Sequence, residues 1–220
     1  MLKFDPSKKS IKKPEFEFYL ESYIPFLKNQ NMIETISFDS IKKSLEESSN
    51  QTIVLHGPPG VGKTSHALHF SHQVKERNNW IVRWFNSDTK ERFLVDLLAF
   101  TDLIREKIDH NKTFEYLIQL IGVEFKKNAA KKFLIVLDNL NDFEWIESFF
   151  TNSPKNVFII ATTTKRNVFN KINATEILVE YFDENQARAL FYKRYNEARK
   201  LSNDEVILLE KYFQYDKVLP

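Results

Sequence analysis

Apolar and polar positions follow two different rhythms along most of the chain. Between residues 52 and 180, short apolar runs that suit strands are separated by longer segments whose apolar residues recur every three or four positions, as in helices. The runs TIVLH, FLIVL and VFIIA are almost wholly apolar, which is typical of strands covered on both faces. This succession of strand, helix and strand, without hairpin dipeptides, predicts a parallel sheet with right-handed crossovers. The expected strands are residues 52–56, 80–85, 133–137, 157–161 and 176–179.

Helical periodicity fills the segments between the expected strands. The helices expected there are residues 63–76, 90–108, 114–127 and 143–150. A shorter helix, 38–46, precedes the first strand, with Ser37 as its expected N-cap. Beyond residue 180 the strand pattern stops. Asp183 and Gln186 have the spacing of a capping box there, and Asn203 is expected to cap a last helix, so a small helical subdomain is predicted after the sheet.

Composition and charge exclude several classes of protein. Hydrophobic residues make up 42% of the 220, with 20 Phe, 8 Tyr and 3 Trp, so the chain can bury a sizeable core. The absence of cysteine excludes disulfides and thiolate metal sites. A net charge of +2 gives no indication of nucleic-acid binding, and no apolar run approaches the roughly 18 residues that cross a bilayer. Together with the polar start MLKFDPSKKS, these features predict a cytoplasmic protein that does not act at membranes.

Glycine is scarce, and its distribution marks one loop. The chain has only four glycines, and three of them fall within six positions. Residues 57–64 read GPPGVGKT, which fits the phosphate-loop pattern G-x-x-x-x-G-K-[ST] between an expected strand and an expected helix. Glycines let successive backbone N–H groups point at phosphate oxygens, and the dipole of the following helix adds positive charge. The residues expected to contact a nucleotide are Gly57, Pro58, Pro59, Gly60, Val61, Gly62, Lys63, Thr64 and Ser65.

The end of this loop and an aspartate on a later strand predict the metal and catalytic chemistry. We expect Lys63 to reach the β- and γ-phosphates and Thr64 to ligate Mg²⁺ through its hydroxyl. The run KKFLIVLDNL leads to Asp138, which the carboxyl edge of a parallel sheet would place beside the loop as a second metal ligand. Lys63 and Asp138 are the candidate catalytic residues. The next residue, Asn139, can position water but cannot accept a proton, so nucleotide binding is predicted ahead of hydrolysis.

The fourth expected strand runs into a polar stretch, ATTTKRN. Polar side chains at this end of a parallel sheet can reach a γ-phosphate, so Thr162, Thr163, Lys165 and Arg166 are candidates to sense it. We assign Thr163 and Lys165 to the nucleotide site. A threonine-rich strand end followed by surface basic residues is the alternative interpretation of the same stretch.

Together, these motifs resemble the NB-ARC group of the STAND nucleotide-switch ATPases. The resemblance covers residues 37–220 and rests on five stretches in order, TIVLHGPPGVGKT, NNWIVRWFNSDTKERFLVDLLAF, KKFLIVLDNL, NVFIIATTTKRN and YFDENQARALFYKR. It implies an α/β fold, the P-loop NTPase three-layer sandwich around a five-stranded parallel sheet, followed by a small helical subdomain. It also implies that ADP or ATP binds with Mg²⁺. The final residue, Pro220, matches a proline that contacts the adenine end of ADP in that family.

The sequence pattern and the resemblance together predict a division of the chain into three parts. Residues 1–36 form a polar N-terminal arm and helices, 37–180 the P-loop nucleotide-binding domain, and 181–220 the start of a helical subdomain that is truncated before the family's winged-helix domain. The sequence departs from the family at three sites. No glycine precedes Gly57, so the Gly-Arg motif that the family has before the first strand is missing. Asp138 is followed by Asn139 instead of a second acid, and the Thr-Thr-Arg sensor is replaced by threonines followed by Lys165.

Three functions remain open from the sequence. The first is a nucleotide-binding signalling switch, in which the γ-phosphate sets the position of the helical subdomain, hydrolysis is slow or absent, and a protein partner or self-association completes the system. The second is an AAA-like ATPase with steady turnover, which would need a carboxylate base and an arginine finger. The third is a degenerate scaffold that binds proteins through exposed phenylalanines. The candidates for that surface are Phe149, Phe150, Phe182 and Phe191.

Overall fold

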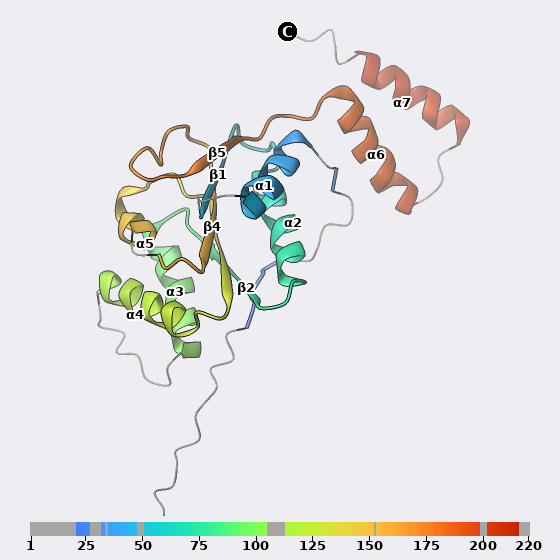
Figure 1. The fold of residues 1–220 in the computed structure, drawn as a ribbon. Coiled ribbons are helices and arrows are strands. Elements are labelled where there is room, and N and C mark those ends of the chain that lie inside the picture. Colours follow the sequence, from blue (N-terminus) through green and yellow to red (C-terminus); the bar gives the residue numbers. More distant parts are fainter. Residues whose placement is uncertain are drawn as a thin grey trace, which may run out of the picture.

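The computed structural model describes residues 21–26, 32–33, 35–47, 51–104, 113–151, 153–198 and 202–215. At its centre lies a sheet of five strands in the order β2-β3-β4-β1-β5 (Figure 1). All neighbouring strands run parallel, which confirms the sheet predicted from the apolar runs. The strands are β1 Thr52–His56, β2 Trp80–Asn86, β3 Lys132–Asp138, β4 Val157–Thr163 and β5 Thr175–Leu178.

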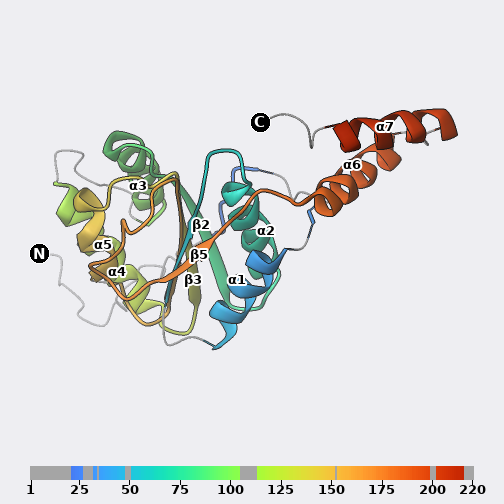
Figure 2. The ribbon, with the colours of Figure 1, turned by 90° about the horizontal axis from the view of Figure 1, so that it is seen from above.

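Helices cover both faces of this sheet and make it the middle of three layers (Figure 2). One face is covered by α1 (Ile36–Glu47) and α2 (Lys63–Lys75), and the other by α3 (Lys90–Ile104), α4 (Phe114–Lys127) and α5 (Glu147–Thr151). The predicted three-layer α/β sandwich is therefore confirmed.

The central strand β3 shows why its sequence is apolar without alternation. Phe133, Ile135 and Leu137 are fully buried in the core under α3, α4 and α5. Leu134 and Val136 are equally buried, in the second core under α1 and α2. Because successive side chains of a strand point to opposite faces, a strand between two helical layers needs apolar residues at every position.

Phenylalanine rings fill much of the larger core. Phe93 of α3 is fully buried, and its ring lies 5.2 Å from Phe85 of β2 and 6.1 Å from Phe149 of α5, measured between ring centroids. Phe149 and Phe150 both belong to this core, with 4% and 9% of their surface exposed. These two residues therefore stabilise the domain and are wrong as candidates for a protein-binding surface.

Two details of the helices differ from the sequence-based expectation. Helix α1 is capped by Thr35, whose hydroxyl accepts the Phe38 N–H at 3.3 Å, while the expected cap, Ser37, donates its hydroxyl to the Leu178 carbonyl of β5. The expected helix 143–150 is divided into a 3₁₀ turn, Glu144–Ile146, and the short α5. In both places neighbouring residues have similar helix or capping propensities, so the sequence alone does not fix the helix boundary.

Two helices follow β5 and lie to one side of the sandwich (Figure 1). Helix α6 (Glu184–Ala198) begins with the predicted capping box, because Asp183 accepts the Gln186 N–H at 2.8 Å and Gln186 accepts the Asp183 N–H at 3.1 Å. Helix α7 (Asn203–Tyr215) is capped by Ser202 instead of Asn203. Among the helices of the described residues, none is long and apolar enough to span a bilayer.

Residues 21–26 lie along β2, which is an edge strand of the sheet. The N–H of Tyr23 donates to the Val82 carbonyl at 2.8 Å, and the hydroxyl of Ser22 accepts the Val82 N–H at 3.0 Å. The guanidinium of Arg83, itself 6% exposed, lies 5.6 Å from the centroid of the Tyr23 ring. This short segment therefore covers part of the outer edge of β2.

Candidate functional site

The predicted phosphate loop joins the end of β1 to the start of α2. Gly57 has φ +146°, and a Cβ on it would lie 2.3 Å from the carbonyl oxygen of Val179, so this position requires glycine. Gly62 has φ +96° and forms the N-cap of α2 without any side-chain hydrogen bond. The first N–H groups of α2 therefore lack a side-chain cap, which is the arrangement that binds anions at helix N-termini.

Lys63 is held against the loop that precedes it. Only 7% of its surface is exposed, and its ammonium donates to the carbonyls of Gly57 at 2.9 Å and Pro58 at 2.7 Å. Burial lowers the pKa of Lys63, and the negative charge of Asp138 opposes this effect. No ion pair neutralises this ammonium within the described part of the chain, so its charge remains available to an anion.

Asp138 joins the phosphate loop to two strands. Its Oδ1 accepts the hydroxyl of Thr64 at 2.9 Å and the hydroxyl of Thr162 at 2.6 Å. Thr162 in turn accepts the N–H of Asn139 at 2.9 Å. The structure thus brings together the two predicted metal ligands, Thr64 and Asp138. It adds Thr162, which the sequence suggested only as a γ-phosphate contact.

The two residues assigned as sensors lie at the end of β4. Thr163 is 1% exposed, and its hydroxyl donates to Asn141 Oδ1 at 3.0 Å and accepts the Lys165 N–H at 3.1 Å. Its register partner on β1 is His56, which ends the strand that leads into the phosphate loop. The side chain of Lys165 is exposed. Contact of either residue with a γ-phosphate stays a prediction, and Pro220 lies outside the described residues.

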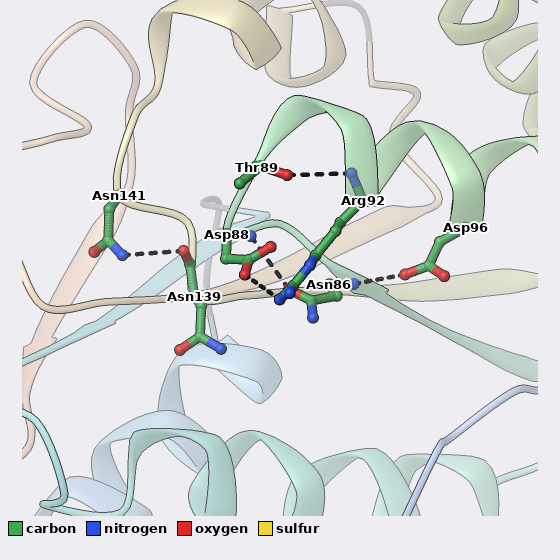
Figure 3. Close-up of polar contacts among 7 residues, drawn as sticks. All are labelled: Asn86, Asp88, Thr89, Arg92, Asp96, Asn139 and Asn141. Carbon is green, nitrogen blue, oxygen red and sulfur yellow. Dashed lines mark hydrogen bonds and ion pairs between the residues drawn. The ribbon is translucent and has the colours of Figure 1, made fainter.

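A polar cluster occupies the same edge of the sheet at the end of β2 (Figure 3). Asn86 lies in register with Asp138, and the next N–H, that of Ser87, donates to the Asp138 carbonyl at 2.7 Å. Asp88 forms an ion pair with Arg92 in the first turn of α3. The carboxylate that follows β2 is therefore already neutralised by a cation.

His66 connects the phosphate loop to the start of α1. Its Nδ1 lies 2.9 Å from the Gly62 carbonyl, so Nδ1 carries the proton, and its Nε2 accepts the hydroxyl of Thr35 at 3.0 Å. Burial lowers the pKa of His66, while the hydrogen bond to Gly62 opposes that shift. The neutral ring of His66 therefore links Gly62 of the phosphate loop to Thr35, which precedes α1.

A cavity of about 360 Å³ lies beside the loop, between three segments of the chain. Its lining includes Gly60, Val61, Gly62, Ser65 and His66 from the loop and α2. Met32 and Ile33 form a second wall, and residues of the 181–194 segment form the third. This volume lies within the range of small-molecule sites.

The fold and the loop define a P-loop NTPase, and comparison with known proteins supports this class. The chain belongs to the NB-ARC family, because the NB-ARC domain profile matches residues 34–201, most of its length. Family and fold together support a nucleotide-binding NTPase. No curated protein sequence matches the chain.

Solved structures with the same fold share little sequence with the chain. The Walker-type ATPase paby2304 of Pyrococcus abyssi is 13% identical with a TM-score of 0.54, over 85% of this chain and 65% of that protein. Cdc6p of Pyrobaculum aerophilum is 11% identical with a TM-score of 0.55, over 80% and 52%. The ORC2 protein of Aeropyrum pernix, solved as ADPNP-ADP complexes, is 10% identical with a TM-score of 0.54, over 76% and 55%. The chain therefore spans between half and two thirds of their lengths.

Several residues around the loop could not be identified from the sequence. Thr35, His66 and Asn141 make hydrogen bonds that connect segments distant in the chain. None of them belongs to the phosphate-loop pattern. Only the position of His66, two residues after Thr64 at the start of α2, placed it near the loop.

Proposed function

We propose that this protein is a nucleotide switch core, which binds ADP or ATP with Mg²⁺ and uses the γ-phosphate to set the position of α6. The observation that carries the proposal is the cavity that joins the phosphate loop to the 181–194 segment. A ligand held by the loop would contact both parts at once. Its presence would therefore favour one position of α6 over others.

The loop has the donors that phosphate requires. Gly62 leaves the start of α2 without a side-chain cap, and Lys63 is buried beside it without an ion-pair partner among the described residues. To bind phosphate, the ammonium would exchange these neutral carbonyl acceptors for anionic phosphate oxygens, so that donor and acceptor would both be charged.

Thr64 and Asp138 fit a magnesium ion. Mg²⁺ prefers oxygen ligands and retains several waters, and these residues place a hydroxyl and a carboxylate 2.9 Å apart beside the loop. When bound, the ion would neutralise charge on the β- and γ-phosphates. The hydroxyl of Thr64 would then direct a lone pair to the ion and its proton away from it.

The polar edge of the sheet supports binding with slow or absent hydrolysis. Asn139 occupies the position after Asp138, and its amide cannot accept a proton from water. The carboxylate of Asp88 forms an ion pair with Arg92. A base would have to be released from that pair before it could activate water.

The first test is the identity of any nucleotide that the purified protein carries. The protein is denatured, and the released small molecules are identified by mass spectrometry. We expect ADP. We also expect Lys63→Ala to abolish ADP binding, while Lys75→Ala, which removes an exposed lysine from the same helix, leaves it unchanged. Full ADP affinity in the Lys63→Ala protein would contradict the proposal.

The alternative functions give different outcomes. Steady phosphate release at ordinary NTPase rates, lost in Asp138→Ala, would favour an AAA-like ATPase. Retained folding without nucleotide binding would favour a scaffold, although Phe149 and Phe150 are unavailable for its surface. The three-part division of the chain, the cytoplasmic location and a protein partner or self-association stay predictions.

A further inference from the structure

Among the described residues that line the cavity beside the phosphate loop, the one with a formally charged side chain is Arg194 on α6. Tyr181, Phe182 and Leu190 supply an apolar wall on the same side, and none of the described residues that line the cavity is acidic. His66 on the opposite side is neutral, because burial lowers its pKa. The cavity therefore combines an apolar surface with one cation, which suits a ligand that has an aromatic base and anionic oxygens.

Arg194 differs from the other cations of the same helix. Arg188 forms an ion pair with Glu184 at 2.8 Å, and Lys193 donates to the Met32 carbonyl at 3.1 Å. Within the described part of the chain, no hydrogen bond or ion pair engages the guanidinium of Arg194, which is exposed. Lys193 thus attaches α6 to the segment before α1, and the next residue, Arg194, lines the cavity.

We propose that Arg194 binds the nucleotide from α6, so that the ligand itself attaches α6 to the phosphate loop. This inference rests on the proposed nucleotide binding. It identifies Arg194 as the residue through which the bound nucleotide is coupled to α6. If Gly60, Gly62 and Ser65 hold the phosphates of a nucleotide, its ribose and base would lie in the cavity that Arg194 also lines. The guanidinium offers five donors and no acceptor, which matches phosphate oxygens and ribose hydroxyls.

The arrangement makes the ligand part of the contact between α6 and the sandwich. Without nucleotide, Lys193 attaches α6 to the segment before α1 through its hydrogen bond to the Met32 carbonyl. With nucleotide, Arg194 adds a second attachment through the ligand. Nucleotide binding should therefore slow the opening of α6, and loss of Arg194 should remove that effect without emptying the loop.

The experiment compares the full chain with Arg194→Ala and Arg194→Gln. Affinity for Mg²⁺-ADP is measured by calorimetry, and amide hydrogen exchange of α6 and of residues 57–64 is measured with and without saturating ADP. We expect about tenfold weaker ADP binding in both variants, since a hydrogen bond to a charged group is lost. We also expect both to lose the ADP-dependent slowing of exchange in α6 while residues 57–64 remain protected.

The control is Lys211→Ala, which removes an exposed cation from α7 and should leave affinity and exchange unchanged. Because Arg194 has no partner among the described residues, both Arg194 variants should unfold at the parent temperature without ADP. Parent affinity and parent protection of α6 in both variants would overturn this inference alone. If the parent protein binds neither ADP nor ATP, the proposed function fails and this inference fails with it.

Discussion

The hydroxyl of Thr64 donates to the carboxylate of Asp138 across a separation of 74 residues in the sequence. The same carboxylate oxygen accepts the hydroxyl of Thr162, which is fully buried. One side chain of β3 therefore holds the start of α2 and the end of β4 together. Asp138 is expected to contribute to stability without any ligand, and to metal binding when a nucleotide is present.

Substitution of Asp138 should separate these two contributions. Asp138→Ala removes the acceptor of two hydroxyls, and we expect the free energy of unfolding to fall by about 1–3 kcal/mol in urea denaturation. Asp138→Asn keeps an acceptor oxygen and should lose less. Both variants should lose the increase in ADP affinity that Mg²⁺ gives the parent protein. Full magnesium dependence in Asp138→Asn would show that this carboxylate is not a ligand.

Substitution of Lys63 should weaken ADP binding without lowering the free energy of unfolding. Its ammonium is buried against two carbonyls, so Lys63→Met removes a desolvated charge while keeping the apolar stem. We expect the unfolding free energy to stay equal or to rise, and ADP affinity to fall by about a hundredfold or more. Urea denaturation and calorimetry measure the two quantities. A large loss of stability would mean that the two carbonyl contacts outweigh the cost of burying the charge.

The glycines offer a matched pair of alanine substitutions. A Cβ at Gly57 would lie 2.3 Å from a backbone oxygen, at φ +146°, so Gly57→Ala should cost more than about 2 kcal/mol. Gly122 lies within α4, where a Cβ meets nothing within 4 Å, and Gly122→Ala should stabilise the protein by about 0.5–1 kcal/mol. Thermal unfolding of both variants checks the contrast. Equal shifts in the two would mean that the loop relaxes around the added methyl group.

The buried ring of His66 predicts a dependence of stability on pH. Burial lowers the pKa of His66 below the unfolded-state value of 6.5, so the unfolded chain takes up a proton more readily than the folded one. The free energy of unfolding should therefore decrease as the pH falls through about 6.5 and level off below the folded-state pKa. The slope from this one group is at most about 1.4 kcal/mol per pH unit.

Urea denaturation at about pH 7.5, 6.5 and 5.5 measures this slope. His66→Gln removes the titrating group and keeps hydrogen-bonding capacity, so its stability should vary less over the same range. The same slope in the parent and the variant would assign the pH dependence to other groups, such as His56, whose pKa burial also lowers.

The fold was predictable because a central strand covered on both faces requires an apolar residue at nearly every position. Every residue of β3 from Phe133 to Leu137 faces a helical layer, so the run is apolar throughout and identifies a strand covered on both sides. The phosphate loop was predictable for a similar reason. A backbone that approaches Val179 as closely as Gly57 does, with positive φ, restricts the residue type strongly.

The surroundings of the loop were not predictable, because their residue types are common and their partners are distant. Thr35 and Ser37 are both good N-caps, and the choice between them depends on which hydroxyl faces His66 and which faces Leu178. The cavity wall that contains Arg194 depends on where α6 packs. Such contacts follow from tertiary packing and leave no periodic pattern in the sequence.

The segment along β2 has a practical consequence for any shortened version of this protein. Ser22 and Tyr23 satisfy both backbone groups of Val82 on the outer side of that strand. A chain that began at residue 37 would expose these backbone groups on an edge strand, which suits pairing with a strand from another molecule. Residues 21–26 are therefore expected to limit aggregation by covering the edge of β2, and recombinant fragments should begin before residue 21.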